Sequence, residues 1–397
     1  MSEFTRRDFL RLSGFTALPA LSPGIFQQDN IDENESPAEV DERVYFVYDG
    51  PMYRPSAYIA KLQDINKDAA IEQDFYAEGG SIDALLKKFI ALTGKEAAIY
   101  MPSGTMANQL AIHVLSGDNT KVFVQETSHV YRDEADAAQA VFNKRLIPVT
   151  QGKTAFSLEE LQAAMDYYEK EEVFKSGTGV VSIENPVRRT DGQSFPIGEI
   201  KKISNWCKEK GYRLHLDGAR LLIASAFIGV SVKEYAAYFD TVYISLYKYL
   251  GAGGGAVLCG EKKVIDKMQH LIKIHGGSVY SNWANAAMAS FHLDGFETRL
   301  KNAIAQSKEL IALLNQLPEL KITPISNGTN MQNLKVSSTI DIAKLRTTLR
   351  EKYKIILGAP REDGFIKLTI NETLSSRQNQ KIISAFKQAL EEAGGKK

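Results

Sequence analysis

The sequence predicts an α/β protein, in which a mostly parallel sheet covered by helices on both faces is followed by a smaller α+β domain. Three observations support this fold class. Apolar runs typical of strands alternate with amphipathic helical stretches between residues 81 and 260, which is the pattern of a covered parallel sheet. Beyond residue 282 the order of elements changes. The 397 residues, 44% of them hydrophobic and 24% charged, are enough for one large core or two.

The elements of the large domain follow from periodicity. Apolar residues at helical spacing predict helices at residues 81–94, 104–115, 157–172 and 197–210. Apolar runs between them predict strands at residues 95–103, 121–126, 145–149, 179–184, 213–217 and 241–247, the last followed by the glycine-rich run 253–260. In an open α/β sheet, ligands bind at the carboxyl ends of the strands. A binding site is therefore expected at that edge.

A second domain is predicted from the change of pattern near residue 291. A long helical stretch at 282–317 is followed by strands at 321–326 and 333–337, a helix at 342–353, a strand at 365–370 and a final helix. Strands and helices in this order are typical of a small α+β unit. The predicted limits are therefore 44–290 for the large domain and 291–397 for the small one.

The N-terminal segment carries the motif Arg6-Arg7-x-Phe9-Leu10 ahead of a short apolar run. That run, residues 12–21, is too short to span a bilayer. The arrangement resembles a twin-arginine export signal, and the alternative is the ordinary basic start of a cytosolic protein. Residues 1–28 are therefore predicted to be a signal segment and residues 29–43 a polar linker, in a protein exported to the periplasm.

Charge and cysteine content exclude several classes of function. The 48 basic and 48 acidic residues leave no net charge, so binding of nucleic acid or of an anionic membrane surface is not expected. Two cysteines, Cys207 and Cys259, are too few for a disulfide framework or a zinc cluster. The expected partner is a small molecule.

A candidate anion site lies where a predicted strand meets the helix that begins at residue 104. Ser103, Gly104 and Thr105 bring hydroxyls and free backbone N–H groups to the positive end of the helix dipole. A phosphate group fits such a site. A plain serine N-cap is the alternative explanation of this sequence.

Polar residues also alternate along the strand RLHLD. His215 and Asp217 face the same side of this strand, and Arg220 follows its end. The pair could be a hydrogen-bonded His–Asp pair of the core or the start of a metal site. No further ligand residue lies nearby at a suitable spacing, so no metal is predicted.

Lys248 lies between the last predicted strand and a run of glycines. A lysine held at a buried strand end loses hydration, so its pKa falls and its neutral amine becomes available for Schiff-base chemistry. The glycines after it leave room for a planar ring or allow the backbone to approach closely. An exposed loop lysine beside a flexible turn is the alternative.

Five stretches resemble the successive sequence blocks of the threonine aldolase and β-eliminating lyase family. They are GKEAAIYMPSGTMANQ, SHVYRDE, ENPVRRTDGQ, HLDGARL and SLYKYLGAGGGA, and they cover nearly the whole chain after the N-terminal segment. The resemblance implies fold type I, the fold of aspartate aminotransferase, with pyridoxal 5'-phosphate as cofactor.

The resemblance also implies roles for single residues in cofactor binding. Lys248 bonds covalently to the cofactor, Asp217 keeps the ring nitrogen protonated, and His129 stacks on the ring. These three are the predicted catalytic residues. The other residues assigned to the cofactor are Ser103, Gly104, Thr105, Asn185 and Ser245.

Substrate and partner contacts are implied in the same way. Arg220 matches the arginine that receives the substrate carboxylate, and Lys367 stands where the family often has a second arginine. Lys273 and Tyr280 match residues that reach the site from a neighbouring subunit. A homodimer or homotetramer is therefore expected.

The sequence departs from the family pattern where the substrate is bound. The stretch VYDGPMYRPSAY does not match the usual N-terminal block, and lysine at 367 cannot replace a guanidinium geometrically. Retro-aldol cleavage of a β-hydroxy-α-amino acid to glycine and an aldehyde is the predicted reaction. The alternatives are β-elimination, racemisation, transamination, or a protein of this fold that binds ligand without turnover.

Overall fold

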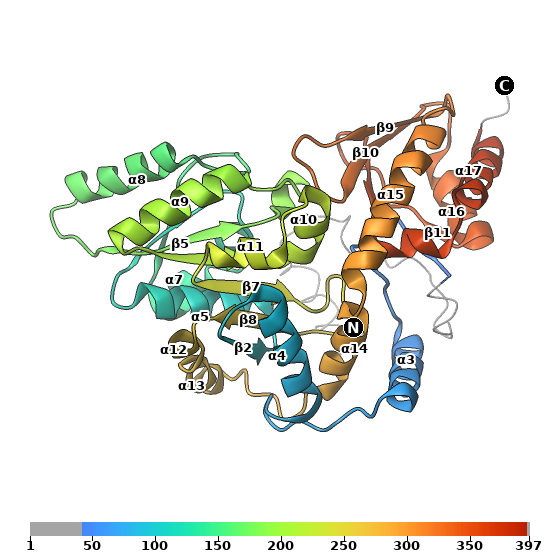
Figure 1. The fold of residues 1–397 in the computed structure, drawn as a ribbon. Helices are drawn as coiled ribbons and strands as arrows, with labels where there is room; N and C mark the ends of the chain where they lie inside the picture. Colours follow the sequence, from blue (N-terminus) through green and yellow to red (C-terminus); the bar gives the residue numbers. More distant parts are fainter. Residues whose placement is uncertain (1–41, 395–397) are drawn as a thin grey trace, which may run out of the picture.

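The computed structural model describes residues 42–394, and a seven-stranded sheet forms the centre of its large domain (Figure 1). The strand order is β2-β8-β7-β6-β5-β3-β4, and only β8 runs antiparallel to its neighbours. The strands are β2 (Ala97–Met101), β3 (Lys121–Val124), β4 (Arg145–Pro148), β5 (Thr178–Glu184), β6 (Arg213–Asp217), β7 (Thr241–Ser245) and β8 (Ala256–Gly260). The predicted mostly parallel α/β sheet is confirmed.

Helices cover both faces of this sheet, because alternate residues of its strands point to opposite sides. Val181 and Ile183 pack into one core, and Val180 packs into the other. The first core is closed by α4 (Gly80–Thr93), α8 (Leu158–Glu171), α9 (Ile197–Lys210), α10 (Leu221–Ile228), α11 (Val232–Ala237) and α14 (Trp283–Leu293). The second is closed by α5 (Gly104–Ser116), α6 (His129–Arg132), α7 (Ala137–Phe142), α12 (Lys262–Ile265) and α13 (Met268–Ile274).

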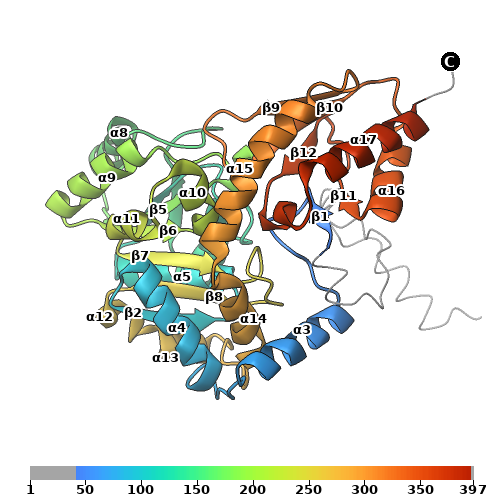
Figure 2. The same ribbon diagram turned by 45° about the vertical axis from the view of Figure 1, so that its right-hand side comes forward.

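The small domain has its own core around a three-stranded antiparallel sheet (Figure 2). Helix α15 (Phe296–Leu314) leads into this domain from α14, and the two helices replace the single helical stretch predicted at 282–317. Asp294 and Gly295 separate them. The remaining elements are β9 (Leu320–Pro324), β10 (Met331–Val336), α16 (Ile342–Tyr353), β12 (Ile366–Thr369), η2 (Glu372–Ser376) and α17 (Asn379–Ala393).

The first described residues belong to the small domain, which differs from the predicted large-domain range of 44–290. Strand β1 (Val44–Tyr45) pairs in parallel with β11 (Ile355–Ile356), and Val44 and Phe46 pack into the small-domain core. The chain then returns to the large domain, where α3 (Pro55–Asp68) packs beside α14. The predicted signal segment and nearly all of the predicted linker lie outside residues 42–394.

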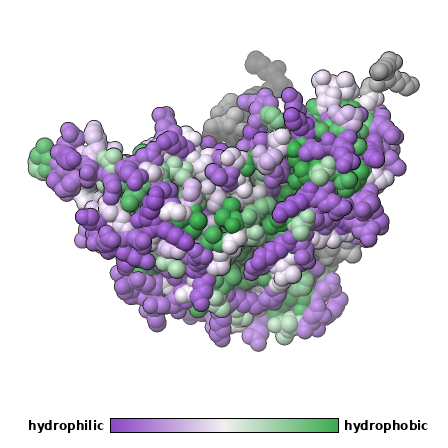
Figure 3. All heavy atoms as spheres, turned by 45° about the horizontal axis from the view of Figure 1, so that its top comes forward, coloured by the Kyte–Doolittle hydropathy of each residue, from purple (hydrophilic) through white to green (hydrophobic). Residues whose placement is uncertain are grey.

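The surface mixes hydrophobic and hydrophilic residues. On the face shown in Figure 3, hydrophobic residues form separate patches, mainly near the centre and over the small domain, among hydrophilic ones. Among the helices of residues 42–394, none combines the length and the apolarity needed to cross a bilayer.

Candidate active site

The predicted anion site lies at the start of α5, beside the carboxyl end of β2. Ser103 is the N-cap of this helix, and its Oγ accepts a hydrogen bond from the Met106 N–H at 3.2 Å. Gly104 packs so closely that a Cβ there would overlap the Tyr243 hydroxyl. The glycine is therefore required by its contact with β7, and Thr105 beside it is half-buried. The helix start thus lies directly against the strand that leads to Lys248.

Asp217 lies buried at the end of β6 and accepts two hydrogen bonds. Its Oδ1 accepts from the Ala219 N–H at 3.2 Å, and its Oδ2 accepts from Asn108 Nδ2 at 2.9 Å. His215 lies on the same face and hydrogen-bonds Thr241 Oγ1 at 2.8 Å and Asn108 Oδ1 at 2.9 Å. Burial lowers the pKa of His215 to about 4, so this histidine is neutral and belongs to the core.

His129, at the start of α6, is held by two buried glutamates. Its Nδ1 lies 2.9 Å from Glu134 Oε1, and its backbone N–H donates to Glu184 Oε2 at 2.6 Å. Burial alone would lower the pKa of His129, but the hydrogen bond to Glu134 and the charge of Asp217 outweigh it and raise the pKa. His129 and Asp217 therefore share one electrostatic environment.

Both glutamates are less acidic than usual. Burial raises the pKa of Glu134, and burial together with the charge of Asp217 raises the pKa of Glu184 to about 7. Glu184 ends β5 and pairs in register with Asp217 on β6. The cluster therefore holds more carboxyl groups than can all be ionised at neutral pH without cost.

His129, Glu134 and Asp217 could each offer one ligand atom to a metal ion, since these atoms lie within 4.8 Å of one another. Glu134 Oε1, however, already accepts hydrogen bonds from both His129 Nδ1 and Asn108 Nδ2. Hydrogen bonds therefore account for the cluster without a metal.

Lys248 follows β7, which ends at Ser245 rather than at 247 as predicted. The half-buried Nζ has no hydrogen-bond or ion-pair partner among residues 42–394. Burial and the nearby charge of Arg220 lower the pKa of Lys248 to about 8, although Asp217 partly opposes them. The buried Ser245 Oγ also lacks a partner among these residues. The site therefore presents a reactive amine and a free hydroxyl close together along the chain.

The glycines after Lys248 serve the path of the loop. Gly251 has a φ of 65°, and a Cβ there would press on the ring of His292. Gly251 therefore allows the loop that follows Lys248 to pack against α14. It does not provide space for a planar ring, which was one of the two roles suggested by the sequence.

Both cations predicted to bind the substrate carboxylate have acidic partners. Arg220 Nε lies 2.6 Å from Asp49 Oδ2. Burial alone would lower the pKa of Arg220, but the charge of Asp49 and the hydrogen bond to it outweigh burial and raise the pKa. The other oxygen of Asp49 accepts from Asn330 Nδ2 of the small domain at 3.0 Å. Lys367 Nζ lies 2.6 Å from Asp191 Oδ2. The two cations are thus held in place at the border between the domains.

Two predicted residues, Lys273 and Tyr280, do not join this cluster within the chain, whereas Asn185 lies beside it. The Asn185 backbone N–H donates to the Asp217 carbonyl oxygen at 3.0 Å, and its buried Nδ2 has no hydrogen-bond partner among residues 42–394. The Asn185 side-chain oxygen accepts from the Ser194 hydroxyl at 2.9 Å and the Phe195 N–H at 2.8 Å, which ties it to the loop after β5. Lys273 and Tyr280 are exposed, and Lys273 Nζ lies 5.1 Å from the centre of the Tyr76 ring.

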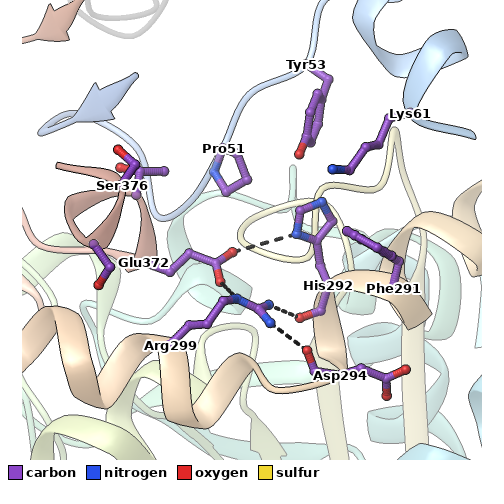
Figure 4. A pocket seen from close by; sticks show the side chains of 11 residues that line it. Pro51, Tyr53, Lys61, Phe291, His292, Asp294, Arg299, Glu372 and Ser376 are labelled. Atoms are coloured by element: carbon purple, nitrogen blue, oxygen red, sulfur yellow. Dashed lines mark hydrogen bonds and ion pairs between the residues drawn. The ribbon is translucent and has the colours of Figure 1, made fainter. Parts of the chain in front are cut away.

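A cavity of about 600 Å³ lies elsewhere, between α14, α15 and η2 (Figure 4). No predicted site residue lines it. Its Arg299 donates to Glu372 Oε2 at 2.5 Å and to the carbonyl oxygens of His292 and Asp294, both at 2.6 Å. The guanidinium is therefore occupied in joining the domains, and the cavity is not the candidate active site.

The sequence prediction missed four residues that shape the site, namely Asn108, Glu134, Glu184 and Asp49. Asn108 could have been found, because it lies four residues after Gly104 and so on the same side of α5. Glu184 ends a predicted strand, as Asp217 does. Glu134 lies in an irregular stretch, but it ends the block SHVYRDE that resembles the family, so that block was a signal for it. Asp49 lies in an irregular stretch that does not match the family and carries no such signal.

The arrangement fits pyridoxal phosphate. The unpartnered amine of Lys248 can bond to an aldehyde, and the buried carboxylate of Asp217 can accept the proton of a ring nitrogen. The start of α5 and the free Ser245 hydroxyl can receive a phosphate. Fold and site together define the class of protein, a fold type I pyridoxal-phosphate enzyme.

The comparisons with known proteins identify the family. The chain matches the family described as beta-eliminating lyase over residues 59–354, and it belongs to this family. It is 31% identical over 304 residues to a low-specificity L-threonine aldolase of Candida albicans, covering 76% of this chain and 80% of that protein. Membership confirms the predicted enzyme class and cofactor, a lyase dependent on pyridoxal phosphate.

Two further comparisons extend this result. A structure from Exiguobacterium sp. 255-15, assigned to the beta-eliminating lyase/threonine aldolase group, has a TM-score of 0.73 and 24% identity, covering 89% of this chain and 99% of that one. This similarity supports the fold. The alanine racemase TOXG of Cochliobolus carbonum is 34% identical over 193 residues, 47% of this chain and 48% of that protein.

Proposed function

We propose that this protein is a low-specificity aldolase that cleaves β-hydroxy-α-amino acids to glycine and an aldehyde. The observation that carries the proposal is the pairing of an unpartnered Lys248 amine with the hydrogen-bonded Asp217–His129 cluster at one edge of the sheet. The similarity to L-threonine aldolases supports the choice of reaction.

Three groups of this chain would hold the cofactor. Lys248 Nζ would bond to its aldehyde, Asp217 would hold the proton on its ring nitrogen, and the start of α5 would receive its phosphate. When bound, pyridoxal phosphate supplies an electron sink for a bond broken at the α-carbon.

The remaining chemistry is proton transfer by this chain's own residues. His129 Nδ1 is held by Glu134, so its Nε2 is left to take the proton of the substrate β-hydroxyl. Lys248, with a pKa lowered to about 8, could hold or return a proton near the substrate α-carbon. Arg220 orients the substrate carboxylate from its anchored position on Asp49.

The direct test is to incubate the purified, cofactor-loaded protein with L-threonine, L-allo-threonine and phenylserine. Glycine and the matching aldehyde should appear in equal amounts. The similarity to an alanine racemase favours racemisation as the second candidate. If L-alanine loses its optical rotation and no β-hydroxy substrate gives an aldehyde, the assigned reaction would be racemisation and not aldol cleavage.

A homo-oligomer is part of the proposal, because an exposed apolar surface lies where Lys273 and Tyr280 were predicted to serve a neighbour. Phe75, Tyr76 and Tyr280 expose 53%, 50% and 58% of their area and contact one another. Such an exposed aromatic cluster is typical of an interface. The expected partner is a second copy of the chain.

The test compares Phe75→Asp with Phe174→Asp by sizing and activity. Phe174 is 92% exposed on the loop after α8 and serves as the matched control. Phe75→Asp should weaken both the oligomer and its activity, and Phe174→Asp should change neither. A parent protein that is fully active as a monomer at high dilution would refute the proposal.

Export by a twin-arginine route is also proposed, from the motif Arg6-Arg7-x-Phe9-Leu10. This route carries folded proteins, so the enzyme would load its cofactor in the cytoplasm and work outside it. Replacing both arginines by lysine keeps the charge but removes the guanidinium pair. In cell fractionation, the double variant should remain in the cytoplasm, active and loaded. Equal export of both forms would contradict the proposal.

A further inference from the structure

Asn108 stands at the centre of the polar cluster, and the chemistry proposed above gives it no role. It lies on α5, fully buried, and bonds to three other residues. Its Nδ2 donates to Glu134 Oε1 at 2.7 Å and to Asp217 Oδ2 at 2.9 Å, and its Oδ1 accepts from His215 Nε2 at 2.9 Å. The Asn108 amide therefore connects its own helix, α5, to a loop residue, Glu134, and to two residues of strand β6, His215 and Asp217.

The orientation of this amide is fixed by its surroundings. With the amide turned over, Oδ1 would face the carboxylate oxygens of Asp217 and Glu134, and Nδ2 would face His215. His215 is neutral and donates from Nε2, because its Nδ1 can accept from the Thr241 hydroxyl at 2.8 Å. Only one arrangement of donors satisfies all four groups.

This arrangement of hydrogen bonds stabilises the Asp217 carboxylate. A carboxylate that accepts two hydrogen bonds is stabilised in its ionised form, and Asp217 accepts one from Asn108 and one from the Ala219 N–H. Without the Asn108 donor, the Asp217 carboxylate would keep only the hydrogen bond from the Ala219 N–H, beside the carboxyl groups of Glu134 and Glu184. A proton shared with a ring nitrogen would then move toward the carboxylate.

The same amide also orients the other end of the cluster. Glu134 Oε1 accepts from Asn108 and lies 2.9 Å from His129 Nδ1, so Asn108 fixes the carboxylate that holds the histidine. His129 and Asp217 are the two residues expected to meet the cofactor ring at its face and at its nitrogen.

We propose that Asn108 is a positioning residue that holds the Asp217 carboxylate as the acceptor for the ring-nitrogen proton and holds Glu134 against His129. The inference rests on the proposed cofactor site. It does not depend on which bond of the substrate is broken.

The test uses the full-length protein loaded with pyridoxal phosphate labelled with 15N in the ring, in the parent, Asn108→Ala and Asn108→Asp. Hydrogen bonds to charged groups are strong enough that losing one should weaken cofactor affinity about tenfold or more. In Asn108→Ala the 15N chemical shift should move toward that of a neutral pyridine. Asn108→Asp, which adds a fourth carboxyl group to the cluster, should show a larger shift and weaker binding.

Asn379→Ala is the matched control, because Asn379 is also buried and donates to Glu309 Oε2 at 2.8 Å, but in the small domain. Its loss should leave the 15N shift and the cofactor affinity at the parent values. If Asn108→Ala does not fold, Asn108→Ser keeps one donor and should give an intermediate shift.

A folded Asn108→Ala protein with the parent 15N shift and an affinity within twofold of the parent would overturn the proposal. A purely structural role would lower the thermal stability of the apoprotein and leave the 15N shift in place. Since neither readout uses aldol cleavage, a wrong reaction assignment would leave this result unaffected. Failure of all variants and the parent to bind cofactor would instead contradict the proposed function.

Discussion

The two sides of the site differ in how their polar groups are used. Around Asp217, hydrogen bonds join the side chains of Asn108, His215, Glu134 and His129 into one cluster. At the end of β7, Lys248 Nζ and Ser245 Oγ have no hydrogen-bond partner among residues 42–394. The hydrogen bonds around Asp217 therefore fix the geometry of that side of the site. The groups at the end of β7 are free to bond to a molecule that enters the site.

The largest effect should come from removing the free amine. Lys248→Ala should abolish covalent attachment of the cofactor and reduce turnover by at least about 1000-fold, because nucleophile and proton carrier are lost together. Borohydride reduction followed by mass spectrometry measures the attachment. Lys95→Met is the matched control, since burial also lowers the pKa of Lys95 but it lies beyond the opposite end of β2. Covalent cofactor on Lys248→Ala would show that another lysine serves the reaction.

A smaller effect is expected on the hydrogen-bonded side. Asp217→Asn should still bind the cofactor but turn over roughly 100-fold more slowly, because an amide does not stabilise a protonated ring nitrogen as a carboxylate does. Steady-state kinetics and a cofactor titration separate the two properties. Unchanged turnover with tight cofactor binding would show that the hydrogen-bonded side around Asp217 does not contribute to catalysis as proposed.

The contact between the two sides can be broken at Gly104. In Gly104→Ala, the new methyl group would overlap the Tyr243 hydroxyl, so the start of α5 must shift. Overpacking of this kind should weaken phosphate binding and lower cofactor affinity about tenfold. Fluorescence titration measures it, with Gly198→Ala, which has open space around it, as control. Equal affinity in the two variants would show that the close approach does not matter.

The smallest effect is a pH dependence. Lys248 has a pKa lowered to about 8, so its reactive neutral form predominates above pH 8 and is lost as the pH falls. The rate at which the apoprotein captures pyridoxal phosphate should therefore rise about fivefold from pH 7 to pH 8 and then level off. Stopped-flow absorbance follows the capture. A rate that keeps rising tenfold per unit to pH 10 would mean that the amine is not perturbed.

Much of the fold could be predicted because periodicity is local. The helices predicted at 197–210 and 342–353 match α9 and α16 residue for residue. The pairing of β1 with β11 was not predicted, because it depends on contacts distant in sequence. The antiparallel direction of β8 was not predicted either, although β8 pairs with β7, the strand directly before it, as well as with the distant β2. Two-residue strands such as β1 carry no periodicity at all.

The residues of the site also divide into those that could be predicted from the sequence and those that could not. Asp217 and Lys248 could be found because each follows a recognisable strand, and their chemistry is unusual for such positions. The acidic partners of Arg220 and Lys367 could not be found, because Asp49 and Asp191 reach them from loops. A sequence shows which groups stand at strand ends, whereas the groups that neutralise them are set by tertiary packing.

The place of the first described strand has a consequence for the order of synthesis. The Tyr45 N–H donates to Thr373 Oγ1 across 328 positions of the chain, and Val44 packs into a core completed by α17. Residues 44–45 are therefore made long before their native contacts, since the chain up to α17 must be made first. The small domain thus closes only after α17 has been made, and a translation product truncated before residue 373 would lack these contacts.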